Sequence, residues 1–91
     1  MATVSLGTTW TSVAADITAI TLVQVQPLGG PYRGSYIAEF VAAGSLPAES
    51  VDGVSLVGGE AIPSAILPDF AASGALYGRS LIGVALDVTV L

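Results

Sequence analysis

The chain has 91 residues, of which 53% are hydrophobic and only 10% are charged, and its seven acidic and two basic residues give a net charge of −5. It contains no Cys and no His, which excludes disulfides, thiolate chemistry, Cys/His zinc sites and a Ser-His-Asp triad. Two arginines on an acidic chain cannot neutralise a phosphate backbone, so we expect no nucleic-acid binding. A chain of this length is predicted to form a single β domain over residues 1–91.

No targeting or membrane signal stands out in the sequence. The first residues lack the basic and apolar regions of a signal peptide. The longest uncharged stretches, such as Ile17 to Tyr32, are interrupted by prolines and glycines, so they do not read as spanning helices. We therefore expect synthesis in the cytoplasm, a chain that is soluble there or once assembled, and no membrane partner.

The first half of the chain predicts three or four strands. Thr3 to Leu6 and Thr9 to Val13 give one or two short strands, and Ile17 to Gln26 is rich in the β-branched residues that suit a pleated sheet. Ser35 to Ala42 alternates with apolar residues on both faces, which predicts a central strand or one under a neighbouring subunit. A helix over Tyr36 to Ala43 is the alternative, because this stretch is rich in alanine.

The second half predicts shorter strands between turns. Asp52-Gly53 and Gly58-Gly59 are typical of tight turns. The final strand alternates, with Val84, Leu86, Val88 and Val90 on its apolar side. The strands and extended pieces expected here are Val54 to Val57, Ala61-Ile62, Ile66-Leu67, Leu76 to Ser80 and the C-terminal strand. Seven or eight short strands predict an all-β fold, either an antiparallel β-sandwich or a jelly-roll-like barrel.

The charged residues offer no recognisable catalytic or metal site. No pair among the seven carboxylates stands out as an acid and base, and we interpret them as solvated loop charges. The two cations, Arg33 and Arg79, are each expected to form an ion pair or to contact an anion such as sulfate or sialic acid, because a partly buried charge needs a partner. We expect no enzyme activity, no cofactor and no metal.

The aromatic residues are interpreted as core or interface anchors rather than as a sugar-binding groove. Trp10 in particular is predicted to be buried at the entrance to a strand. The other aromatic side chains weighed in this way are Tyr32, Tyr36 and Tyr77.

The surface is predicted to be covered by other proteins. A folded monomer of this mass exposes on the order of 4,900 Å², which nine charged side chains cannot cover well. The segment Ala61 to Gly74 is the most apolar loop and packs either on its own sheet or on a neighbour. Its large side chains, together with an aromatic on the next strand, are the predicted contact residues: Ile62, Ile66, Leu67, Phe70 and Tyr77.

A series of short segments gives the chain a resemblance to a known group of proteins. In order, they are Thr9-Trp10-Thr11-Ser12-Val13, Gln24-Val25-Gln26, Asp52-Gly53, Leu56-Val57-Gly58-Gly59-Glu60, Leu76-Tyr77-Gly78-Arg79-Ser80, Gly83 and Ala85-Leu86-Asp87-Val88-Thr89-Val90. The series resembles the small β-sandwich virion structural proteins of tailed bacteriophages. The chain departs from them in having Tyr77 where Trp is frequent.

The resemblance implies a non-enzymatic virion protein that decorates or cements the capsid, usually as a trimer. Its expected partners are the major capsid protein or another virion protein, and copies of itself. Two alternatives stay open, a tail- or fibre-associated protein and a carbohydrate-binding attachment module. A gene beside the major capsid gene favours decoration, whereas a gene beside tail genes favours the fibre interpretation.

Overall fold

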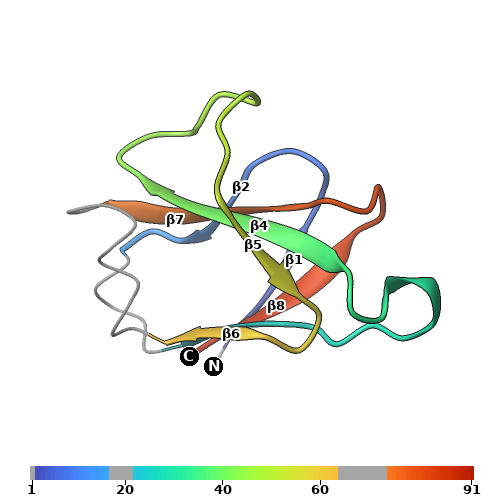
Figure 1. Cartoon of the computed structure of the whole chain (residues 1–91). Helices are drawn as coiled ribbons and strands as arrows, with labels where there is room; N and C mark the ends of the chain where they lie inside the picture. The colour runs from blue at the N-terminus through green and yellow to red at the C-terminus, as the bar shows by residue number, and fades with distance from the viewer. Residues whose placement is uncertain (1, 17–21, 64–73) are drawn as a thin grey trace.

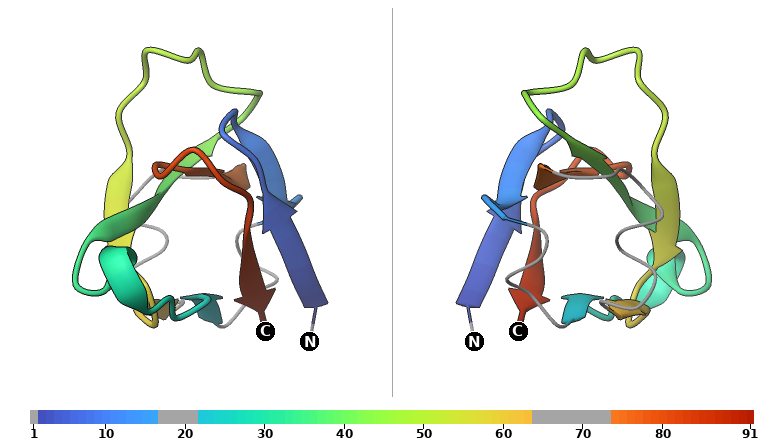
Figure 2. Two further views of the ribbon diagram at one scale, coloured as in Figure 1. Left: turned by 90° about the vertical axis from the view of Figure 1, so that its right-hand side faces the viewer. Right: turned by 90° about the vertical axis from the view of Figure 1, so that its left-hand side faces the viewer.

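Two antiparallel sheets enclose the core of the molecule (Figures 1 and 2). The computed structural model describes residues 2–16, 22–63 and 74–91. Within these residues, four strands form one sheet in the order β1-β8-β3-β6, and four form the other in the order β2-β7-β4-β5. The predicted all-β antiparallel sandwich is therefore confirmed. The described strands are β1 (Ala2–Leu6), β2 (Thr11–Ala14), β3 (Leu22–Val25), β4 (Tyr36–Ala43), β5 (Val54–Val57), β6 (Ala61–Pro63), β7 (Ala75–Ser80) and β8 (Leu86–Val90), and a short 3₁₀ helix, η2, covers Gly30–Tyr32.

Successive strands change sheets along most of the chain. Among the described strands, only β4 and β5 follow one another within the same sheet. Both chain ends lie side by side, because Ala2 of β1 pairs with Val90 of β8 (Figure 1). At the other end of β1, the Ser80 N–H donates to the Gly7 carbonyl at 2.7 Å, which joins the two sheets along this side.

The core lies between the sheets and receives alternate residues of each strand. Val88 of β8 and Leu76 of β7 are fully buried, as the period of two predicts. Phe40 is the largest fully buried side chain and packs over Gly78, where an added Cβ would lie 2.8 Å from its ring. Burying one such apolar side chain contributes about 1.5–3 kcal/mol. Gly78 therefore makes room for the aromatic ring at the centre of the core.

The stretch after residue 35 is a strand and not a helix. β4 lies between β7 and β5 in its sheet, so the predicted central position is confirmed. A register shift between Tyr36 and Ala38 allows the adjacent residues Ile37 and Ala38 both to be buried. The mainly apolar sequence of β4 fits its place between two neighbours.

Two predictions for the local structure were wrong. The turn near Asp52-Gly53 forms instead at Ala48 to Val51, where the Val51 N–H donates to the Ala48 carbonyl at 3.0 Å. Gly53 lies so close to the backbone of Phe40 that an added Cβ would overlap the Phe40 carbonyl oxygen. Glycine is needed there for close approach between strands rather than for a turn. Val84 lies outside β8 and is 47% exposed, because the chain is still turning after Gly83.

The turn at Gly58-Gly59 is confirmed. The Glu60 N–H donates to the Val57 carbonyl at 3.0 Å, and Gly59 has a φ of 88°, which only glycine adopts readily. This turn carries the chain from β5 in one sheet to β6 in the other.

No helix among the described residues is long and apolar enough to cross a membrane.

Candidate functional site

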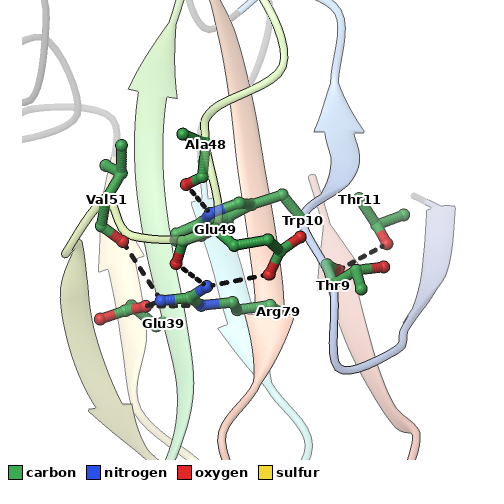
Figure 3. A network of polar contacts seen from close by, with 8 residues as sticks. All are labelled: Thr9, Trp10, Thr11, Glu39, Ala48, Glu49, Val51 and Arg79. Carbon is green, nitrogen blue, oxygen red and sulfur yellow. Dashed lines mark hydrogen bonds and ion pairs between the residues drawn. The ribbon is translucent and has the colours of Figure 1, made fainter.

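A cluster of polar and aromatic side chains lies on the outer face of the β2-β7-β4-β5 sheet, under the loop at residues 44–53 (Figure 3). We call it the Arg79 cluster, and it comprises Trp10, Glu39, Glu49 and Arg79. The sheet itself sets two of its members side by side, because Glu39 of β4 and Arg79 of β7 are register partners. Their neighbours along the strands face the core, so strand alternation directs these two side chains outward.

The Arg79 guanidinium is surrounded by acceptors of its own chain. Its Nε and Nη2 atoms each lie 2.7 Å from Glu39 Oε1, and both side chains are largely buried, with 14% and 8% of their surface exposed. Nη2 also donates to the Val51 carbonyl at 3.2 Å. Nη1 donates to the Glu49 carbonyl at 2.9 Å and lies 3.4 Å from Glu49 Oε2, on a carboxylate that is 66% exposed.

Trp10 completes the enclosure of the guanidinium. The Arg79 Cζ atom lies 4.2 Å from the centroid of the Trp10 ring, which is cation–π geometry. The indole Nε1–H donates to the Ala48 carbonyl at 3.0 Å, and the residue is only 5% exposed. Trp10 is therefore a buried anchor, as predicted, but it packs on the outer face of the sheet rather than in the main core.

The cluster fastens a loop to a sheet. The three backbone carbonyls of Ala48, Glu49 and Val51 all accept hydrogen bonds from the two side chains below them (Figure 3). In a loop of this length, such carbonyls would otherwise be solvated and the backbone would retain more conformational freedom. The N–H groups of the Arg79 guanidinium point at acceptors of the same chain. Arg79 therefore forms an ion pair within the protein.

The interpretation of all carboxylates as solvated loop charges was wrong for Glu39. Glu39 is 6% exposed and lies in the central strand β4. Its burial is possible because Arg79 supplies an opposite charge and a hydrogen bond from Nε to Glu39 Oε1. The contacts that the 44–53 loop makes with Trp10 and Arg79 were not predicted from the sequence. The signal that could have suggested them is an arginine and a glutamate on predicted neighbouring strands, each at an outward position.

The other predicted cation lies apart from this cluster. Arg33 follows η2 and is exposed, and no carboxylate within the described part of the chain lies within ion-pair distance of it. The tyrosines also differ in their surroundings. Tyr32 packs against the core, whereas Tyr36 at the start of β4 is 63% exposed.

The predicted contact residues lie partly within the described part of the chain. Ile66, Leu67 and Phe70 lie outside the described residues, and Ile62 lies in β6. Tyr77 is half-buried on β7, on the same outer face as Arg79. The importance of these five residues for binding stays a prediction.

Comparisons with known proteins return no relative for this chain, because no family model, curated protein or solved structure matches it. The described residues contain neither a pocket nor a group of acidic side chains that could hold a metal ion. The contacts and the surface of the chain itself are therefore the basis for assigning its function.

Proposed function

We propose that the chain is a non-enzymatic structural protein of a phage particle, a capsid decoration or cement protein that binds between capsid subunits. The observation that carries this proposal is the exposure of large apolar side chains on a surface with few charges. Among the described residues, six such side chains are between 42% and 66% exposed: Tyr36, Leu46, Val54, Leu81, Val84 and Leu91.

The composition of the surface favours contact with other proteins. Single exposed apolar residues are common on soluble proteins, but here only nine residues in the chain carry charge. When a partner covers apolar surface and removes it from water, the complex is stabilised by about 25 cal/mol per Å². The surface of a protein that stays bound to a capsid is largely out of water, so it does not need many charges to keep it soluble.

The Arg79 cluster supports a docking role for the 44–53 loop. Leu46 is 66% exposed on this loop, while the backbone two to five residues further on is held by Trp10 and Arg79. A loop that is already ordered loses less conformational entropy on binding. The mechanism would be passive, because the chain bridges neighbouring capsid subunits and resists their separation.

The carbohydrate-binding alternative has less support. A sugar-binding groove brings several exposed aromatic faces together. Trp10 is only 5% exposed with Arg79 against its ring, Tyr32 packs against the core and Tyr77 is half-buried, which leaves Tyr36 as the largely exposed aromatic among the described residues. The tail- or fibre-associated alternative makes the same use of apolar surface and differs only in its partner.

Binding to capsid shells tests the proposal. The chain would be co-expressed with the major capsid protein encoded in the same genome, and the particles would be separated on a density gradient. We expect the chain to migrate with the shells at a fixed ratio to capsid subunits. Shells that migrate without the chain would contradict the capsid role, and recovery with tails or fibres would favour the alternative.

A variant at the loop tip sharpens this experiment. Leu46→Ser should raise the apparent Kd for shells about tenfold or more if this side chain is a contact anchor. Ser45→Ala is the matched control, because it changes the neighbouring exposed residue without removing apolar surface. Equal binding by both variants would place the contact elsewhere on the chain.

A further inference from the structure

Three of the four sheet edges in the described part of the chain carry a feature that prevents further strand pairing. Edge β2 has a register shift between Ser12 and Ala14, and such bulges disrupt a ladder. On β5, the Val57 N–H donates to the Glu60 carboxylate, which also places a negative charge there. Edge β6 ends at Pro63, which has no N–H to donate. These are the usual protections of an exposed edge.

The fourth edge, β1, has none of these features. Its sequence, Ala2–Leu6, contains no charge and no proline, and its pairing with β8 runs without a register shift. Figure 2 shows β1 at the margin of its sheet, beside β8. An uncharged and regular edge strand is a template for pairing with another strand.

The hydrogen-bond pattern identifies the backbone groups that β1 presents outward. Leu22 and Leu91 exchange hydrogen bonds between β3 and β8, and the Gln26 N–H donates to the Asp87 carbonyl, so odd-numbered residues of β8 face β3. Even-numbered residues of β8 therefore face β1. Because the β1–β8 register pairs Val4 with Val88, Thr3 and Ser5 direct their N–H and C=O groups away from the sheet.

A contact beyond the strand supports this assignment. Gly7 has the same parity as Thr3 and Ser5, and its carbonyl accepts from Ser80 on the side away from β8. Among the described residues, no backbone group forms a hydrogen bond with Thr3 or Ser5 on this side. Both side chains are exposed, whereas Val4 between them packs toward the core.

We propose that β1 pairs antiparallel with β1 of a second copy of this chain, around a two-fold axis at Val4. In this register, Thr3 lies opposite Ser5 of the partner subunit, and each of these residues donates its N–H and accepts at its C=O. The two β1-β8-β3-β6 sheets then become one continuous sheet. Hydroxyl side chains oppose one another across the junction, and such cross-strand pairs are favourable.

The partner is a second copy because the edge is self-complementary. A two-fold contact brings the same residues of both subunits together, so a charge on the strand would be repelled by its own copy. β1 is uncharged although the chain carries a net charge of −5. The inference goes beyond the proposed capsid role, because it stands on the strand edges whether or not the chain belongs to a virion. It predicts dimers, whereas the resemblance to virion proteins implies trimers.

Sedimentation of the purified chain over a range of concentrations tests the pairing. We expect reversible association to twice the monomer mass of 9.0 kDa. Replacing both outward residues, with Thr3→Lys and Ser5→Lys, sets like charges opposite each other and should weaken association about tenfold or more. The matched control carries Ser45→Lys and Ser50→Lys, which add the same charge on an exposed loop far from β1 in the sequence.

Mixing oppositely charged variants gives a result that a change in folding cannot produce. A chain with Thr3→Glu and Ser5→Glu should form a mixed dimer with the lysine variant, detected by native mass spectrometry, while neither associates with itself. If a charged variant fails to fold by circular dichroism, Thr3→Pro removes the outward N–H alone and should also give monomers. A wild-type chain that stays monomeric, forms trimers, or associates as strongly with these substitutions as without them would overturn the proposal.

Discussion

The outer faces of the two sheets are treated in opposite ways. On the β2-β7-β4-β5 sheet, which we call the covered face, Glu39 and Arg79 lie beneath the 44–53 loop and Trp10 packs with them. On the β1-β8-β3-β6 sheet, which we call the open face, small or polar side chains are exposed, and among the described residues they contact a turn where Gln24 Nε2 donates to the Gly59 carbonyl at 3.2 Å. They include Thr3, Ser5, Gln24 and Asp87.

This difference shows what the buried ion pair of Glu39 and Arg79 requires. A charge beneath a loop needs a partner and hydrogen bonds, and the Arg79 cluster supplies both. An exposed hydroxyl on an open face is solvated and needs no partner within the chain. Substitutions on the covered face should therefore cost stability, and those on the open face should cost little.

The largest effect is expected from Trp10→Ala. This change removes a buried ring, leaves the Ala48 carbonyl without its donor and exposes the guanidinium of Arg79. We expect a loss of about 3–5 kcal/mol in the free energy of unfolding, measured by urea denaturation with circular dichroism. Tyr36→Ala removes an aromatic that is 63% exposed and serves as the control. Similar small losses from both would mean that the covered face does not depend on its indole.

A smaller effect is expected from Glu39→Ala, which leaves Arg79 enclosed without its main carboxylate. Because the guanidinium keeps two backbone acceptors, we expect a loss of about 2–4 kcal/mol in the same unfolding experiment. Glu49→Ala removes a carboxylate that is 66% exposed and keeps its carbonyl contact, so it should cost less than about 1 kcal/mol. Equal losses would show that burial of the ion pair is unimportant.

The smallest effect is expected on the open face. Thr3→Ala should change the free energy of unfolding by no more than about 0.5 kcal/mol, because the side chain is exposed. The measurement should be made at low protein concentration, where pairing between copies does not contribute. A loss comparable with that of Glu39→Ala would remove the contrast between the two faces.

The sequence alone predicted most of the strands that the structure describes, although it left a helix open over Tyr36 to Ala43. Leu86, Val88 and Val90 alternate with polar residues, and they are the buried residues of strand β8. Val54 to Val57 has turn-type residues on both sides in the sequence and forms strand β5. These signals are local, because the period of a strand is carried by neighbouring residues. These signals are less reliable at the ends of strands. Val84 fits the alternation of the last strand, although it lies in the bend before β8.

Only the tertiary structure decided what the same residues contact. In the sequence, Glu39 has the pattern of a solvated charge, but in the fold its strand lies beside β7, where Arg79, forty residues along the chain, provides a partner. The pair Asp52-Gly53 is typical of a turn in the sequence, but in the fold Gly53 lies against the backbone of Phe40. Strand order, register and the position of the 44–53 loop depend on pairing between distant segments. Periodicity within a segment carries no information about which other segment will lie beside it.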